Sequence, residues 1–312
     1  MKPVRRAGSA NGRYDMTADY DNATILRVTY RFLRLSILAV VALLAVSLLF
    51  ERIKSGCLQG SISSYYYTPV RSVFVGALLA ISVCLISIKG VGNTEDIALN
   101  LAGMFAPVVA FVPTDGQGTC QWVRTIPDPP VDPRGVPITN GLLPDWVVAN
   151  VKNNVFALLV VGVIAIVVIS IMNKRHADAP GVERIKRLNI SLIATEVVLA
   201  IAVVLYFRWG DVKTWSHFAA AGAMFFCFWI AVGANAFKRP NQASHYKAIF
   251  TLIFVLMPVA LGAILVASHL FAPWEETIYW LEVAEILLFA SFWLVQTVQR
   301  WNDEHASGAP AN

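Results

Sequence analysis

Long apolar stretches recur along the whole chain, and they limit its fold more than any other feature. Each stretch has roughly 18 residues or more, enough for a helix to cross about 30 Å of hydrocarbon. Hydrophobic residues make up 57% of the 312 residues and charged residues only 14%, against about 25% charged in soluble domains. Lipid offers no partners to the edges of an open sheet, and the sequence lacks the short alternating strands of a membrane barrel. We therefore predict an all-α polytopic integral membrane protein.

The apolar stretches predict eight transmembrane helices in a single membrane domain that covers 32–297. The expected spans are about 32–50, 69–89, 97–113, 154–172, 189–207, 216–236, 248–270 and 277–297. We expect a flexible basic tail at 1–31 and a second tail at 298–312. The two longest outside loops are expected at 51–68 and 114–150.

Four alanines give the third expected span a stripe of small residues. They recur at every fourth position, as Ala98, Ala102, Ala106 and Ala110. Small side chains let helix backbones approach closely in a membrane. Asn100 and Pro107 make this the weakest of the eight spans, but the alanine stripe predicts close packing against another helix.

The basic residues predict how the helices are oriented. Most of the 25 lysines and arginines lie on the side of the membrane that holds the N-terminus. Cytoplasmic loops carry the excess of Lys and Arg, so both termini are expected in the cytoplasm. The net charge of +5 then reflects contact with anionic membrane lipids. No basic stripe interleaved with aromatic residues indicates a nucleic-acid partner.

The four cysteines differ in their expected positions. Cys84 and Cys227 fall inside predicted spans, where a small apolar role is usual. Cys57 and Cys120 fall in the two long outside loops, where an oxidising exterior permits a disulfide. A Cys57–Cys120 bridge and two unrelated thiols are the alternatives, and spacing alone does not decide between them.

Polar and ionisable residues gather at the predicted outer ends of several spans. The stretch SISSYYYTPVRSVFVG, residues 61–76, leads into the second span. The candidate ligand-binding residues are Ser61, Tyr65, Tyr66, Thr68, Arg71, His217, Glu282 and Glu285. Glu282 and Glu285 share one helix face because they are three residues apart. Carboxylates inside a membrane helix usually face a partner or a wet cavity.

This cluster has several interpretations, and three of them involve no reaction. In the first, ion pairs tie the helix ends together and the tyrosines belong to the interfacial aromatic belt. In the second, an outer-leaflet pocket binds a lipid headgroup or a small polar ligand without a cofactor, and Arg71 contacts an anionic group. In the third, Glu196 in the fifth span belongs to the path of a proton- or ion-coupled transporter.

The enzymatic alternative is a zinc-dependent intramembrane lipid hydrolase. His217, His269 and Glu282 or Glu285 would supply two histidines and a carboxylate, and Zn²⁺ with an open position activates water. However, the sequence has no HxxxH or HExxH spacing, and three of its five histidines lie on the predicted cytoplasmic side. Walker, Rossmann and GxSxG motifs are also missing. A binding protein without enzymatic activity is therefore the leading hypothesis.

Several polar stretches are similar to a known group of proteins. They are SISSYYYTPVRSVFVGALLAI, EDIALNLAGMFAPVVAFVPT, WSHFAAAGAMFF and YWLEVAEILLFASFWLV. They resemble bacterial multi-pass membrane proteins that have no established activity, and the resemblance extends over about a third of the chain, mostly in the second, third, sixth and eighth expected spans. The resemblance implies a helical fold in a bacterial cytoplasmic membrane. It favours a polar signature of Ser61, Tyr65, Tyr66, Thr68, Arg71, Asn100, His217 and Glu282, and it does not include Glu285.

Overall fold

The computed structural model of the chain describes residues 11–90, 92–114, 145–175, 182–208, 213–238, 242–270 and 276–307. Within these ranges the fold consists of helices, without strands. The elements are α1 (Asn11–Ser55), η1 (Ser63–Tyr67), α2 (Arg71–Ser87), α3 (Asn93–Phe111), α4 (Asp145–Arg175), α5 (Val182–Arg208), α6 (Lys213–Phe237), α7 (Ser244–Leu270) and α8 (Thr277–Ser307). η1 is a short 3-10 helix and the others are α-helices.

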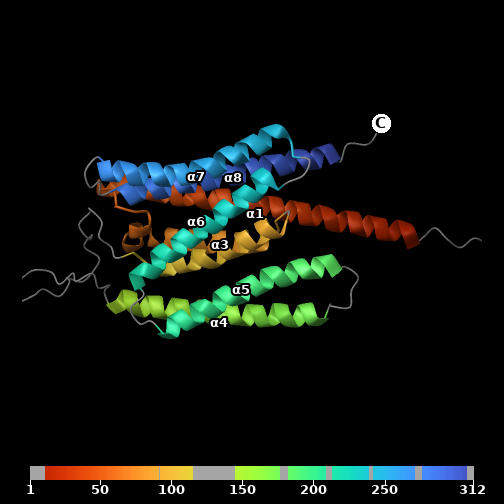
Figure 1. Cartoon of the computed structure of the whole chain (residues 1–312), viewed down its shortest axis with the longest axis horizontal. Coiled ribbons are helices and arrows are strands. Elements are labelled where there is room, and N and C mark those ends of the chain that lie inside the picture. Colours follow the sequence, from red (N-terminus) through yellow and green to blue (C-terminus); the bar gives the residue numbers. More distant parts are fainter. Residues whose placement is uncertain are drawn as a thin grey trace, which may run out of the picture.

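Six helices form a ring, and the other two pack outside it. In the order α1, α2, α3, α6, α7 and α8, each helix packs against the next, and α8 packs against α1. The α4–α5 hairpin contacts α3 from outside and lies along one flank of the bundle (Figure 1). About 6% of the residues in the spans of α4 and α5 are buried, against 56% in α3. The ring is therefore the packed body of the protein.

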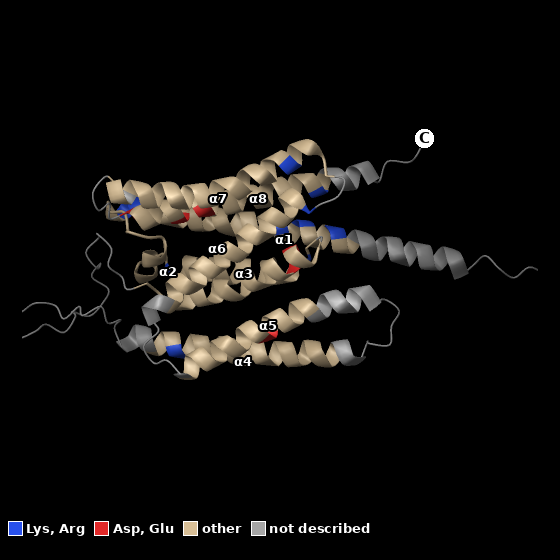
Figure 2. Cartoon of the chain, viewed as in Figure 1, with Lys and Arg blue, Asp and Glu red and all other residues tan. Residues whose placement is uncertain are grey.

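The helices are those of a multi-pass membrane protein. Seven of the described helices are long and apolar enough to cross a membrane, and α2 is an eighth apolar helix of 17 residues. The all-helical prediction is confirmed to this extent. Lys and Arg lie mostly toward the two ends of the bundle (Figure 2). The start of α1 and the end of α8 lie at one end, called here the terminal end, and η1 lies at the other, called the η1 end (Figure 1).

Several helices extend beyond the expected spans. α1 is 45 residues long and begins at Asn11, whereas the sequence predicts a flexible tail at 1–31. α8 continues to Ser307, into the second expected tail. At 1.5 Å per residue, α1 is about 68 Å long, more than twice the hydrocarbon thickness. The apolar pattern locates only the part of a helix that lies in lipid, which is why the expected ends are too short.

The alanine stripe of α3 packs as its spacing predicts. Ala98 is 3% exposed, and Ala102, Ala106 and Ala110 are fully buried, in a helix that contacts both α2 and α6. Between α2 and α3, the Ser82 hydroxyl donates to the Gly103 carbonyl at 2.6 Å. A Cβ at Gly103 would lie 2.7 Å from the Ile86 side chain. The prediction of close helix packing in this span is confirmed.

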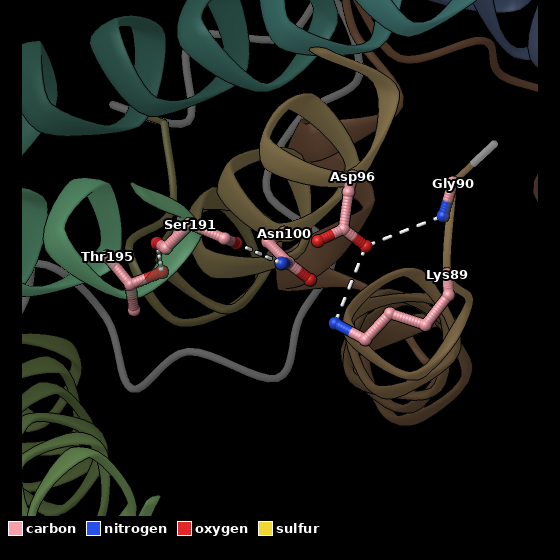
Figure 3. Close-up of polar contacts among 6 residues, drawn as sticks. All are labelled: Lys89, Gly90, Asp96, Asn100, Ser191 and Thr195. Carbon is pink, nitrogen blue, oxygen red and sulfur yellow. Dashed lines mark hydrogen bonds and ion pairs between the residues drawn. The ribbon is translucent and has the colours of Figure 1, made fainter. Parts of the chain in front are cut away.

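Polar contacts join α3 to α2 and to the outer hairpin (Figure 3). Lys89 pairs with Asp96 at 3.4 Å across the turn between α2 and α3. One turn further along α3, the Asn100 amide nitrogen donates to the Ser191 hydroxyl of α5 at 2.8 Å. Asn100, which interrupts the apolar span, thus connects the outer hairpin to the ring by a hydrogen bond. Its amide oxygen is buried without a hydrogen-bond partner among the described residues.

Candidate functional site

A cavity of about 80 Å³ lies inside the helix ring. Side chains from α1, α2, α3, α6 and α8 line its wall, together with Ile62 and Ser63 at η1. Ser63 and Glu282 are the polar residues of this lining, and all the others are apolar. On α8 the lining runs from Glu282 to Phe289, a helical rise of about 10 Å. The cavity is therefore apolar along its length, with a carboxylate and a hydroxyl at its η1 end.

The segment before α2 closes the η1 end of the ring. The Tyr279 amide of α8 donates to the Gly60 carbonyl at 2.9 Å. The Tyr67 hydroxyl donates to the Thr114 carbonyl, beyond the end of α3, at 2.6 Å. These bonds fix η1 between α3 and α8. Ser63, in the first turn of η1, consequently lies against Glu282 although the two residues are far apart in the sequence.

Side-chain bonds to the backbone at the two ends of η1 explain part of the sequence-predicted cluster. The Ser64 amide donates to the Ser61 hydroxyl oxygen at 3.0 Å, and the Thr68 hydroxyl donates to the Tyr65 carbonyl at 2.8 Å. Serine and threonine side chains commonly satisfy backbone groups at helix ends in this way. Ser61 and Thr68, both predicted as ligand-binding residues, have the observed role of holding the ends of η1.

Glu282, Ser63 and His217 form a continuous hydrogen-bonded chain beside the cavity. The Glu282 carboxyl group accepts from the Ile62 amide and from the Ser63 hydroxyl at 3.0 Å. The Ser63 oxygen lies 3.0 Å from Nε2 of His217. Nδ1 of His217 lies 2.5 Å from the Val112 carbonyl oxygen. His217 is 1% exposed, so the chain is enclosed by protein.

The Val112 carbonyl determines which nitrogen of His217 carries a proton. A carbonyl oxygen only accepts, so Nδ1 must be the donor in that bond. The proton at Nε2 is then the variable one, because a hydroxyl both donates and accepts. The same orienting bond, from Nδ1 to a backbone carbonyl, is how proteins commonly fix a histidine tautomer. Sequence reasoning identified His217 and Glu282 correctly as neighbours but missed Ser63 between them.

The polar stretch contains no sequence signal that distinguishes Ser63 from Ser61. Ser63 stands two residues before Tyr65 in SISSYYYT, whereas the sequence reasoning selected Ser61. Both serines are buried, and neither polarity nor hydropathy separates them. The 3-10 turn of η1 separates them, because it directs Ser63 to Glu282 and His217 and leaves the Ser61 hydroxyl to accept from the Ser64 amide. Such a short turn has no periodicity that a sequence reveals.

The tyrosines and Arg71 form a second group, apart from the cavity lining. Nη2 of Arg71 donates to the Tyr66 hydroxyl at 2.7 Å, and its guanidinium lies 4.3 Å from the Tyr66 ring centroid. Burial raises the pKa of the Tyr66 hydroxyl, an effect that the nearby Arg71 charge only partly offsets. Tyr65 packs near Tyr279 with ring centroids 6.4 Å apart. Neither tyrosine lines the cavity, nor does Arg71, so the predicted pocket that contained all of them is not the cavity observed.

Glu285 differs from Glu282 although it lies one turn away on α8. It is 7% exposed, and its Oε2 atom has no hydrogen-bond partner among the described residues. It is not part of the cavity lining. Glu196, the residue assigned to a transport path, is exposed on α5 and lies 3.5 Å from the Ser170 hydroxyl of α4. Glu196 thus belongs to the outer hairpin and not to the ring.

The structure describes both histidines that the zinc alternative requires, His217 and His269. His269 is exposed near the end of α7, whereas both ring nitrogens of His217 already have oxygen neighbours. Within the described ranges, no three residues of the types His, Cys, Asp and Glu are gathered as a metal site requires. The residues present therefore do not fit a His₂Glu zinc centre, and we derive no reaction from it.

The cysteines agree with their expected environments as far as they are described. Cys57 is disulfide-bonded, while Cys84 and Cys227 are free and buried. The expected partner, Cys120, lies outside the described residues, so the Cys57–Cys120 pairing stays a prediction.

A second polar cluster, which the sequence reasoning missed, lies toward the terminal end of the ring. Gln296 of α8 donates to Glu95 of α3 at 3.0 Å and accepts from Nε of Arg34 of α1 at 3.1 Å. Asn235 of α6 donates to the same Glu95 oxygen at 2.8 Å. All four side chains are at most 5% exposed. Arg34 stands near the start of the first expected span, 32–50, and Glu95 just before the third, 97–113, and hydropathy indicates no buried partner for either residue.

Comparison with known proteins adds no function to this geometry. The chain matches no family model, no curated protein and no solved structure.

Proposed function

We propose that this protein binds a small amphipathic molecule in its central cavity. The aliphatic part of the ligand lies among the apolar side chains, and its polar head donates hydrogen bonds to Glu282. The observation that carries the proposal is the composition of the cavity lining, which is apolar except for Ser63 and Glu282 at one end. Binding sites of this kind combine an apolar wall with a few polar groups that fix orientation.

The chemistry of the polar end restricts the headgroup. A carboxylate has about four acceptor positions on its two oxygens, and Ile62 and Ser63 occupy two of them. The remaining acceptors favour a head that donates hydrogen bonds, such as an alcohol or an amine. An anionic head would face a like charge in a poorly screened site. The proposal thus replaces the predicted anion contact at Arg71, which bonds to Tyr66.

The proposed setting is a bacterial cytoplasmic membrane, crossed eight times with both termini in the cytoplasm. The eight α-helices among the described residues and the common end of α1 and α8 (Figure 1) support this topology. The excess of lysines and arginines on the side of the termini supports the orientation. The η1 end of the cavity then lies at the depth of the outer leaflet, where lipids and molecules from outside can reach it.

The test is photolabelling of the protein in lipid nanodiscs with an octanol that carries a diazirine on its chain. An octyl chain is comparable in length with the rise of about 10 Å between Glu282 and Phe289 on α8. We expect saturable labelling of peptides that contain Phe225, Phe228 or Phe289. Excess octanol should compete with the label, whereas excess octanoate should not.

A matched pair of variants separates the cavity from the membrane-facing surface. Ala221→Phe adds a ring in the cavity lining and should abolish saturable labelling. Gly222→Phe adds the same ring at the next residue, where a Cβ has open space around it, and should leave labelling unchanged. Equal labelling of both variants and of the unmodified protein would refute the cavity as the binding site.

A further inference from the structure

We infer that the terminal end of the ring binds the phosphate group of an anionic phospholipid through Arg300 of α8. This site lies at the opposite end of the ring from η1 (Figure 1), and it does not depend on the ligand proposed for the cavity. Its evidence is a partly buried guanidinium group that no described carboxylate neutralises, together with further basic residues around it.

Arg300 lies on the face of α8 that points into the ring. It follows Gln296 by four residues, so the two side chains share one helix face, and Gln296 bonds to α1 and α3. Arg300 is partly buried. Its Nε atom is covered and has no hydrogen-bond partner among the described residues, and no described carboxylate forms an ion pair with it. A covered charged group without a partner is costly, so we expect an acceptor from outside the chain.

A second guanidinium group lies beside the same turn of α8. Cζ of Arg31 on α1 lies 4.3 Å from the centroid of the Trp301 ring, and Trp301 is the residue that follows Arg300. Trp301 is 43% exposed and ends the apolar span of α8. Tryptophan is typical of the depth at which lipid headgroups begin. Helices α1 and α8 therefore bring two arginines together at headgroup depth.

The carboxylates described at this end are engaged elsewhere. Glu95 belongs to the buried cluster of Gln296, in which Arg34 supplies the positive charge. Asp96 pairs with Lys89 at 3.4 Å. Lys238, at the end of α6, adds a further positive charge and donates to a neutral threonine hydroxyl at 3.1 Å. The side chains described here therefore leave an excess of positive charge on α1, α6 and α8.

An unsatisfied amide group lies at a similar depth. Phe250 of α7 packs against Phe292 of α8 with ring centroids 5.4 Å apart, and the two helices run in opposite directions (Figure 1). Gln242 precedes Phe250 by eight residues and Arg300 follows Phe292 by eight, so both lie a similar distance toward the terminal end. Both polar atoms of the Gln242 amide are covered and have no hydrogen-bond partner among the described residues. An amide of this kind donates to a phosphate oxygen and accepts from a headgroup hydroxyl.

A phospholipid fits this end better than a soluble anion does. Guanidinium groups bind phosphate oxygens through two parallel hydrogen bonds. Leu294 and Val298 are 54% and 46% exposed and share the face of α8 that carries Trp301. Acyl chains attached to the phosphate therefore have apolar side chains to lie against. Basic pockets between transmembrane helices bind anionic lipid headgroups in this way.

The experiment titrates the full chain in a neutral detergent with phosphatidylglycerol or with phosphatidylcholine, which has no net charge, and counts bound lipid by native mass spectrometry. We expect the first phosphatidylglycerol to bind more tightly than the first phosphatidylcholine. Arg300→Gln should weaken phosphatidylglycerol binding at least about tenfold, the smaller effect of losing a hydrogen bond to a charged group. Arg27→Gln removes the same charge from an exposed position on α1. It should weaken binding less than about fivefold, the general attraction of one basic residue to an anionic surface.

Melting temperatures without anionic lipid separate binding from folding. Arg300→Gln should then be as stable as the unmodified protein, since Arg300 has no described hydrogen-bond partner to lose. Lower stability would give Arg300 a structural role and overturn the site. Equal weakening by Arg300→Gln and Arg27→Gln, or equal binding of the two lipids, would also overturn it. Displacement of phosphatidylglycerol by an equal concentration of inorganic phosphate would overturn the assignment to a lipid.

Discussion

The polar cluster toward the terminal end of the ring gives the sharpest prediction about stability. Gln296 is 1% exposed and joins three helices to α8 through its one amide group. It accepts from Arg34 at 3.1 Å and donates to Glu95 at 3.0 Å, with a longer contact of 3.4 Å to Asn235. Gln296→Leu keeps the approximate size of the side chain and removes all three contacts.

The expected cost follows from the two shorter bonds, both to ionisable partners. Hydrogen bonds to charged groups contribute about 1.5–3 kcal/mol in soluble proteins, whereas polar contacts in membrane proteins average about 0.6 kcal/mol. An intermediate value of about 1–1.5 kcal/mol for each bond gives a loss of about 2–3 kcal/mol in the free energy of unfolding. Burial of the leucine side chain does not offset this loss, because Arg34 and Glu95 remain buried and each loses a hydrogen-bond partner.

The assay is reversible unfolding in mixed micelles with increasing dodecyl sulfate, followed by circular dichroism. Thr297→Val is the matched control, because Thr297 is the next residue, is 6% exposed, and among the described residues its hydroxyl donates only to the Trp293 carbonyl of its own helix, at 2.6 Å. We expect it to lose less than about 1 kcal/mol. A Gln296→Leu protein that is no less stable than Thr297→Val would refute the view that this cluster holds the ring together.

Three further results are expected. Gly103→Val should lower the melting temperature, since its side chain meets α2 at 2.7 Å and overpacking costs about 1–3 kcal/mol; Gly222→Ala, with open space around its Cβ, should not. Tyr66→Phe should cost about 1.5–3 kcal/mol for a lost hydrogen bond to a charged group. Because burial raises the pKa of Tyr66 above 10.0, its pH-linked contribution is complete below pH 10.0 and declines as pH rises through the folded value, so the loss of stability on titration should be smaller in the phenylalanine variant. Peptide mapping without reductant should recover Cys57 linked to Cys120; recovery of Cys120 as a free thiol would contradict that pairing.

The general fold could be predicted because lipid restricts the backbone structures that an apolar segment can form. Apolar runs of sufficient length must be helical in lipid, and the alanine stripe at 98, 102, 106 and 110 predicted its own burial. The ends of α1 and α8 could not be predicted in this way. Outside the hydrocarbon a helix no longer requires apolar side chains, so hydropathy loses the signal where the helix continues.

The candidate site was predictable in part. His217 and Glu282 stand out as ionisable residues near the predicted ends of apolar spans, and the structure brings them together through Ser63. Arg71 stood out for the same reason, yet it bonds to its sequence neighbour Tyr66. Hydropathy gives the depth of a residue along a helix, but it does not give the direction in which the side chain points around the helix axis.

The sequence by itself determined that this protein is helical, polytopic and rich in polar residues at one end of its spans. Only the tertiary structure decided that six helices form a ring, that α4 and α5 lie outside it, and that Arg34 and Glu95 are buried. The physical reason is that the free energy of transferring a helix into lipid depends on the composition of that segment alone. Ring closure and the pairing of buried polar groups depend on which helix faces meet, and those contacts join residues up to 262 positions apart.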